Sequence, residues 1–192
     1  MSASYPWTSA NTPSVDLSYP IGKFDGKLDA TTAVAPDLLQ QGIAVLAAAP
    51  ERYRIAVAGL DDRQLDAPYR PDGWTVRQVV HHVPDSHMNA YIRFRLAVTE
   101  DSPLVKPYDQ TKWAELRDAK TLPVEVSLGL LDGLHQRWVA LLRSFSDGDF
   151  ARTLRHPELG VLRLDQYVGL YAWHSRHHCA HIAGLRERMG WK

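Results

Sequence analysis

Histidine is the residue type whose number and spacing could support chemistry in this chain of 192 residues. The chain has nine histidines, and seven of them fall in two short stretches. The first stretch holds His81, His82 and His87, and the second holds His174, His177, His178 and His181. Because imidazole is the commonest metal ligand in proteins, the two stretches predict a metal site if the fold brings them together.

Within the second stretch, two pairs are spaced by four residues, His174 with His178 and His177 with His181. Side chains four residues apart lie on one face of a helix, so either pair can supply two ligands to one ion. A third imidazole would then come from the first stretch. Three histidines with a fourth position left open is the pattern of a catalytic zinc site, whereas a structural site uses four protein ligands.

Rotation by about 100° per residue places each histidine relative to the apolar stripe of its helix. His177 and His181 lie to one side of their stripe, and His82 begins a polar line that continues to Arg93. A polar line beside an apolar stripe is typical of a cleft wall. We therefore predict His82, His177 and His181 as the metal ligands. Arg93 is a candidate contact for an anionic substrate, and a solvated arginine is the competing interpretation.

The other histidines of the two stretches have different predicted roles. His174 and His178 lie nearer the centre of their stripe and are interpreted as core groups that orient the ligands. His87 falls on the apolar stripe of its own helix, and His81 points away from both the stripe and the cleft.

Three further residues with potential ligand atoms are assigned no role in the site. His135 and His156 stand alone in the sequence and are interpreted as structural or solvent-exposed. Cys179, the single cysteine, lies two residues from His177 and two from His181, so it points to the far side of the helix. We expect it to be a small buried apolar residue and not a ligand.

The elements that must position these residues are four amphipathic helices. Helical periodicity of apolar residues covers about 37–59, 75–98, 124–145 and 165–189. Four long helices in one chain of this length predict an all-α four-helix bundle. We expect an irregular N-terminal arm over residues 1–36 and a single domain over residues 37–192.

Local signals refine this prediction. Thr75 and Gln78 form a capping-box pattern at the start of the second helix. Pro50 and Pro84 each remove a helical hydrogen bond, so Pro50 is expected to bend or divide its helix and Pro84 to kink its helix just after His81 and His82. Residues 100–123 are expected to form a long loop that is either functional or flexible, and residues 156–160 a turn or small hairpin.

Composition limits the classes of partner. The chain carries 22 Lys and Arg against 22 Asp and Glu, and zero net charge argues against nucleic acid as the main partner. No apolar run approaches the length of a membrane span, and the first 20 residues lack the pattern of a signal peptide. A single cysteine fits a reducing compartment, so a cytoplasmic location is expected.

Several familiar catalytic motifs are absent from the sequence. There is no H-E-x-x-H, so the glutamate base of zinc proteases is not supplied on a helix. Glu-x-x-His pairs are also absent, which favours one ion over a two-metal carboxylate centre. No G-x-S-x-G, P-loop or G-x-G-x-x-G sequence occurs.

Five runs of the sequence, which include both histidine stretches, resemble the YfiT family of the DinB superfamily. The resemblance extends from about residue 15 to residue 191 and rests on the runs YPIG (19–22), DGWTVRQVVHH (72–82), DSHMNAYIR (85–93), LHQRW (134–138) and LYAWHSRHHCAHI (170–182). Pro84 departs from the family pattern and makes the local helix geometry uncertain.

The resemblance implies a four-helix bundle with one divalent ion, zinc or nickel, held by three histidines. By motif position these would be His82, His177 and His181, the same trio that helical rotation selects. It further implies a metal-dependent hydrolase of a small-molecule substrate, cytoplasmic and homodimeric, in which the ion activates water.

Two alternatives remain open at this point. The superfamily includes thiol S-transferases, and the ion would then activate the thiolate of a low-molecular-weight thiol such as bacillithiol. The absence of a carboxylate base favours this chemistry, whereas the family description favours hydrolysis. The third interpretation is a non-catalytic metal-binding stress protein.

Overall fold

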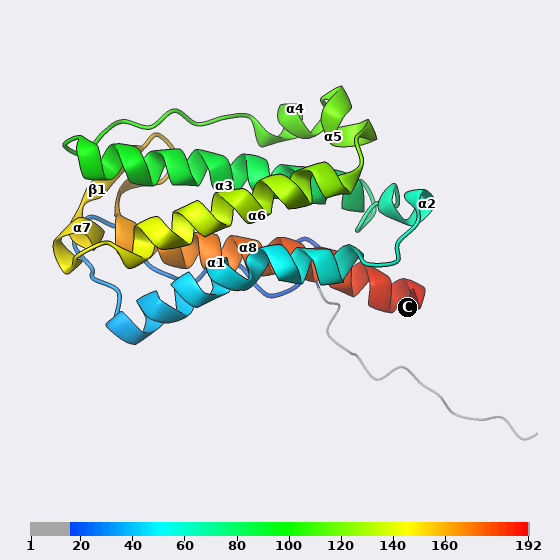
Figure 1. Cartoon of the computed structure of the whole chain (residues 1–192), viewed down its shortest axis with the longest axis horizontal. Helices are drawn as coiled ribbons and strands as arrows, with labels where there is room; N and C mark the ends of the chain where they lie inside the picture. Colours follow the sequence, from blue (N-terminus) through cyan, green and yellow to red (C-terminus); the bar gives the residue numbers. More distant parts are fainter. Residues whose placement is uncertain (1–15, 192) are drawn as a thin grey trace, which may run out of the picture.

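The computed structural model describes residues 16–191 and contains the four long helices of a bundle. These are α1 (Pro36–Val57), α3 (Val76–Thr99), α6 (Val124–Arg143) and α8 (Leu164–Met189). They run alongside one another through the length of the molecule (Figure 1). The predicted all-α four-helix bundle is confirmed, and its helices begin and end within a few residues of the predicted bounds.

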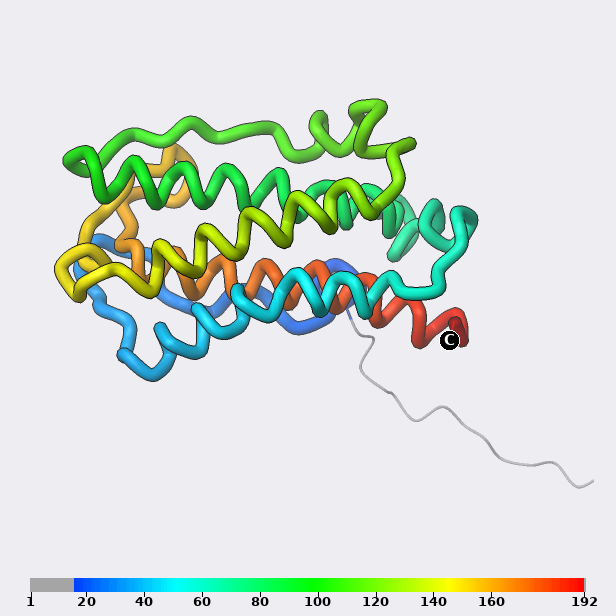
Figure 2. Tube along the Cα trace, in the orientation of Figure 1, coloured from blue at the N-terminus to red at the C-terminus, as the bar shows by residue number. Residues whose placement is uncertain are grey.

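The order of the helices around the bundle decides which residues meet. Helix α1 packs against α8 and α6, and α3 packs against α6 and α8. The first two long helices of the chain, α1 and α3, therefore stand at opposite corners, as the tube in Figure 2 also shows. Because α3 and α8 are neighbours, the two histidine stretches face each other although they are far apart in the sequence.

Short elements complete the described structure. They are α2 (Asp62–Leu65), α4 (Gln110–Ala114), α5 (Arg117–Thr121), α7 (Asp147–Ala151), β1 (Thr153–His156) and β2 (Gly160–Arg163). The two strands pair antiparallel, so the turn or hairpin predicted near residues 156–160 is present. The segment predicted as a long loop, residues 100–123, contains α4 and α5, which lie beside α3 (Figure 1). Helices this short give no periodic signal in the sequence.

The start of α3 is held as the sequence predicts. The backbone N–H of Gln78 donates to Thr75 Oγ at 3.1 Å, and the backbone N–H of Thr75 donates to Gln78 Oε1 at 2.9 Å. This reciprocal capping box pairs two donors that a helix N-terminus otherwise leaves open. Neither proline ends its helix, because α1 continues past Pro50 and α3 past Pro84.

The buried core divides into two apolar clusters along the bundle axis. One is built around Phe94 and Trp138, and the other around Val80 and Ile182. On α3, α6 and α8 the positions between the clusters carry buried histidines. The histidines thus form a polar layer across the middle of the bundle.

The described part of the N-terminal arm, residues 16–35, has no helix or strand and packs along α8. The backbone N–H of Asp29 donates to Gln166 Oε1 at 2.7 Å, and Gln166 Nε2 donates to the carbonyl of Thr32 at 2.6 Å. Residues 1–15, which hold the rest of the predicted arm and most of the stretch in which no signal peptide is expected, lie outside the described residues. Between residues 16 and 191, no helix has the length and apolar character needed to span a membrane.

Candidate metal centre

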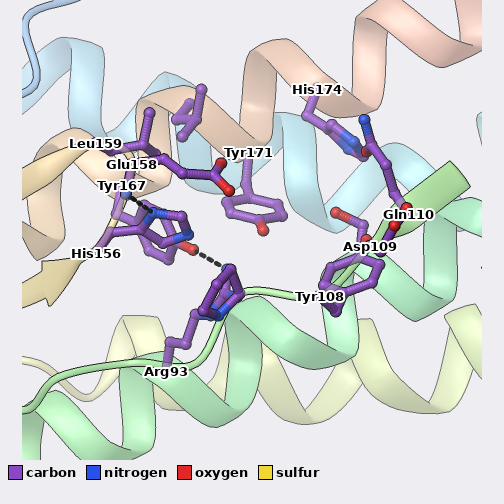
Figure 3. Close-up of a pocket in the computed structure, with 13 residues that line it drawn as sticks. Arg93, Tyr108, Asp109, Gln110, His156, Glu158, Leu159, Tyr167, Tyr171 and His174 are labelled. Atoms are coloured by element: carbon purple, nitrogen blue, oxygen red, sulfur yellow. Dashed lines mark hydrogen bonds between the residues drawn. The ribbon is translucent and has the colours of Figure 1, made fainter.

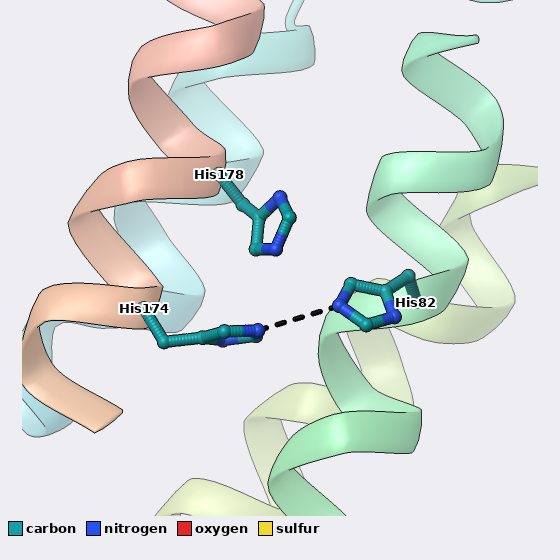
Figure 4. Close-up of side chains that lie close together, drawn as sticks. All are labelled: His82, His174 and His178. Carbon is teal, nitrogen blue, oxygen red and sulfur yellow. Dashed lines mark hydrogen bonds between the residues drawn. The ribbon is translucent and has the colours of Figure 1, made fainter. Parts of the chain in front are cut away.

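Three imidazoles from two helices converge in the polar layer. His82 of α3 and His174 and His178 of α8 place one ring nitrogen each within 4.8 Å of the others. Nε2 of His82 and Nε2 of His174 are 3.3 Å apart (Figure 4). Two nitrogens on one tetrahedral zinc are separated by about 3.3 Å when each Zn–N bond is about 2.0–2.1 Å. The pair therefore has the spacing of two neighbouring ligands.

A second group lies on α8 alone. His177, His178 and His181 also bring one ring nitrogen each within 4.8 Å of the others, so His178 belongs to both groups. In each of these three residues Nδ1 is buried and has no hydrogen-bond partner among residues 16–191. Nε2 of His181 is engaged differently, since it lies 3.3 Å from the carbonyl of Ser18 in the arm.

The trio predicted from the sequence is divided between the two groups. His82 belongs to the first group, whereas His177 and His181 belong to the second. As a ligand set, that trio stays a prediction. His174 and His178 were expected only to support the ligands, yet they lie directly against His82. They face the centre of the apolar stripe, and the polar layer crosses the bundle interior, so the residues on the stripe are the ones that meet His82.

Burial keeps these imidazoles neutral. It lowers the pKa of His82 to about 4, with a smaller contribution from the positive charge that His177 would carry. Burial also holds the pKa of His174 and of His178 well below the usual value for histidine. Neutral imidazole is the form that binds a metal ion, so the site does not have to lose protons near neutral pH to accept one.

A chain of hydrogen bonds fixes the tautomer of His174. Nδ1 of His135 lies 2.6 Å from the carbonyl of Leu46, Nε2 of His135 lies 2.7 Å from Nδ1 of His87, and Nε2 of His87 lies 3.1 Å from Nδ1 of His174. A carbonyl only accepts, so His135 Nδ1 carries a proton and its Nε2 accepts. The same logic puts the proton of His87 and of His174 on Nδ1. Nε2 of His174 is therefore unprotonated, and its lone pair faces Nε2 of His82 at 3.3 Å.

The first hydrogen bond in this series of imidazoles, from His135 to the carbonyl of Leu46, depends on Pro50. Proline has no backbone N–H, so the carbonyl of Leu46, four residues earlier in α1, has no helical donor. Nδ1 of His135 donates a hydrogen bond to this carbonyl in place of the missing backbone N–H. His135, expected as structural or solvent-exposed, is 1% exposed and connects α1 to the candidate ligands.

Aromatic residues surround the histidines at the cavity next to them, which has a volume of about 500 Å³. Trp74 lies against His82, with ring centroids 4.8 Å apart. Tyr69 stacks on His181 at 4.0 Å, and Trp173 stacks on His177 at 4.4 Å. Since His174 and His178 line the same cavity, a small molecule entering it reaches these two residues.

A larger cavity of about 620 Å³ also reaches His174 (Figure 3). Its lining includes Arg93, which the sequence predicted as a substrate contact, and the previously unassigned His156. His174 thus lies where two cavities meet. Arg93 is buried and its guanidinium is turned into the larger cavity, toward Tyr167.

His81 and Cys179 also carry atoms that could bind a metal ion, but they lie apart from the two histidine groups. His81 Nδ1 is 2.7 Å from Ser127 Oγ and its Nε2 is 3.1 Å from the carbonyl of Leu122. It thus faces α6 and the turn before it and belongs to neither histidine group, which fits the prediction that it points away from the cleft. Cys179 belongs to neither histidine group and lines a different cavity with Tyr53. It is only partly buried, which corrects the expectation of full burial.

Comparison with known proteins places this geometry in a family. The model of the DinB superfamily matches residues 46–182. Candidate metal-dependent hydrolases of Bacillus mycoides and Bacillus cereus are 53% identical over 176 residues, covering 92% of this chain and 99% of theirs.

Two solved structures resemble the fold. YfiT from Bacillus subtilis, described as a candidate metal-dependent hydrolase with an unusual four-helix bundle topology, is 48% identical with a TM-score of 0.88, covering 93% of this chain and 100% of that one. A mycothiol-dependent maleylpyruvate isomerase aligns with a TM-score of 0.57 at 15% identity, covering 72% and 60% of the two chains. At that identity the second likeness concerns the fold alone.

Proposed function

The chain belongs to the DinB superfamily, and we propose that it is a metal-dependent hydrolase of a small-molecule substrate, with one divalent ion held by three histidines. The observation that carries this proposal is the convergence of three imidazoles, those of buried His82 and His178 and of partly buried His174, between α3 and α8. The names of its Bacillus relatives, which describe candidate metal-dependent hydrolases, support the same class of activity.

We propose His82, His174 and His178 as the ligands. They come from two helices that face each other, they are neutral, and the lone pair of His174 Nε2 is directed at the site by the chain of hydrogen bonds from Leu46. The set predicted from sequence, which keeps His82 but takes His177 and His181, is the competing ligand set. Imidazole ligands suit zinc and nickel alike, so both ions are candidates.

The chemistry follows from an incomplete ligand shell. A divalent ion with three neutral ligands and one open position lowers the pKa of bound water toward 7 and so supplies a nucleophile. The protein contributes the fixed tautomer of His174, the aromatic shielding by Trp74, and two cavities through which a substrate reaches the centre. Neither histidine group includes a carboxylate in the described structure, so the proposal assigns no protein side chain as general base.

The test combines metal removal with a panel of substrates. Purified protein is stripped with a chelator, reloaded with zinc or nickel, and assayed against esters and amides beside a conjugation assay with bacillithiol and monobromobimane. We expect hydrolysis that is lost on stripping, regained on reloading and absent from His82→Ala, while His81→Ala retains it. Metal-dependent conjugation without hydrolysis would support the thiol S-transferase instead, and turnover in neither assay would favour a non-catalytic metal-binding protein.

We also propose a small-molecule partner, a cytoplasmic location and a homodimer, as expected from the sequence. Zero net charge supports a small-molecule partner over nucleic acid, and the single cysteine supports a cytoplasmic location. Homodimerisation is implied by the family resemblance and is tested by light scattering of the metal-loaded protein.

A further inference from the structure

The larger cavity contains a buried positive charge without a counter-charge. Arg93 is 6% exposed, and no carboxylate lies within 4.0 Å of it among residues 16–191. Nη1 donates to Tyr167 Oη at 2.9 Å and Nη2 donates to the carbonyl of Lys106 at 2.8 Å. A guanidinium has five N–H donors, so three have no acceptor in the described structure. None of the Arg93 nitrogens is among the buried atoms without a partner, so these donors open into the cavity, where an entering anion can pair with the charge.

The position of Arg93 relative to the histidines sets the size of that partner. Its guanidinium contacts Tyr167, which precedes His174 by seven residues on α8. At a rise of about 1.5 Å per residue, Tyr167 and His174 are about 10 Å apart along the axis of α8. Figure 3 shows Arg93 and Tyr167 at one side of the cavity and His174 at the other, with the ring of Tyr171 between them.

The acidic residues of this cavity do not neutralise Arg93. Asp109 and Glu158 line the cavity but are exposed at its rim, where water screens their charge. Asp109 is also paired with Lys112, with Nζ to Oδ2 at 3.0 Å. The positive charge is therefore at the buried floor and the negative charges are at the solvent.

We propose that Arg93 binds the carboxylate of an elongated organic acid whose reactive group lies against the histidine centre at His174. The planar guanidinium can present parallel N–H groups to both oxygens of a carboxylate, a match that a neutral polar group does not offer. The wall between the two ends, formed in part by Tyr171 and Leu170, suits an apolar or aromatic spacer. This inference rests on the proposed function for the identity of the reacting end, but the carboxylate subsite can be measured separately.

The probes are suberic acid monohydroxamate and the analogue in which its carboxylate is a methyl amide. The hydroxamate end binds metal ions, and the chain extends far enough to place the other end near Arg93. Affinities are measured by calorimetry on zinc-loaded protein and by ligand-observed NMR on metal-free protein. We expect the acid to bind at least about 10-fold more tightly than the amide, because it gains charge-assisted hydrogen bonds. Equal affinities of acid and amide in both forms of the protein overturn the proposal.

Variants of Arg93 and Arg95 show which arginine causes the preference for the acid over the amide. Arg93→Gln should abolish the preference for the acid and leave the affinity for the amide unchanged, whereas Arg95→Gln removes the same charge from an exposed position on the same helix and should retain the preference. If Arg93→Gln does not fold, Arg93→Lys keeps the charge and should retain part of the preference. A preference for the acid that persists in folded Arg93→Gln overturns the assignment. If zinc loading raises the affinity for neither probe, the proposed metal site is wrong. The comparison of acid with amide on metal-free protein still decides the role of Arg93.

Discussion

His135 donates from Nδ1 to the carbonyl of Leu46 at 2.6 Å, and it can do so unopposed because Pro50 supplies no helical donor to that carbonyl. The contact joins α6 to α1 and begins the chain of imidazoles that ends at His174. A proline that the sequence suggests only as a bend or a break therefore frees the Leu46 carbonyl, the acceptor at which the chain of imidazoles to the candidate metal centre begins.

Replacing His135 should weaken metal binding from a distance. In His135→Phe the ring volume is kept, but His87 loses its acceptor and no longer holds the proton of His174 on Nδ1. Loss of such supporting hydrogen bonds typically costs about 10–100-fold in metal affinity, which competition with a chromophoric chelator measures. His81→Phe is the matched control, since His81 also contacts a backbone carbonyl but is outside the chain. Unchanged zinc affinity in His135→Phe, or an equal loss in both variants, would falsify the role assigned to the chain.

The two candidate ligand sets give opposite results in a pair of variants. His174→Ala should lose its zinc if the ligands are His82, His174 and His178, and His177→Ala should then keep it. The reverse result would establish the set predicted from sequence. His82→Ala should lose the metal in either case and serves as the positive control. Elemental analysis of the purified proteins, with circular dichroism to confirm folding, makes the distinction.

Trp138 should contribute strongly to stability. It is fully buried within the apolar cluster that it shares with Phe94, and its ring packs edge-on against His87 and His135. Trp138→Ala should lower the free energy of unfolding by about 3–5 kcal/mol. Trp138→Phe should cost less, because the indole Nε1 is buried without a hydrogen-bond partner in the described structure and phenylalanine removes that polar group. Chemical denaturation of the two variants measures the difference, and equal losses would contradict this explanation.

Asp85 should make stability depend on pH. Partial burial, with a smaller contribution from the charge of Asp118, raises the pKa of Asp85 to about 6 in the folded protein. Because this value lies above that of the unfolded chain, ionisation disfavours folding as pH rises from about 4 through 6. Asp85→Asn should therefore raise the melting temperature at pH 8 and leave it unchanged at pH 4. Metal-free protein is used so that ligand protonation does not contribute, and exposed Asp101→Asn is the control.

The start of α3 gives a prediction that follows from sequence and structure together. Thr75→Ala removes the acceptor for the N–H of Gln78 and should lower the free energy of unfolding by about 1 kcal/mol. Thr75→Ser keeps the hydroxyl and should restore most of the loss. Both are measured by denaturant titration, and a neutral effect of Thr75→Ala would mean that packing of Trp74 and Val76 alone holds this end of the helix.

Much of the fold follows from local patterns that the sequence carries by itself. Helical periodicity predicts the four long helices, and the Thr75–Gln78 pair predicts where α3 begins. The far-side position of Cys179 also follows from spacing alone, as does the separation of His81 from the site. These features depend on the geometry of one helix, and one helix is fully described by its own residues.

Which histidines meet between α3 and α8 is decided only by the tertiary structure. Rotation about a helix axis gives the direction of a side chain but not the neighbour that it meets, so it could not show that His174 and His178, on the inner face of α8, lie against His82. The contact of His87 with His135 joins residues 48 positions apart and leaves no spacing signal. Placing α1 opposite α3 brings the two histidine stretches together, because it makes α3 and α8 neighbours, and this packing depends on all four helices at once.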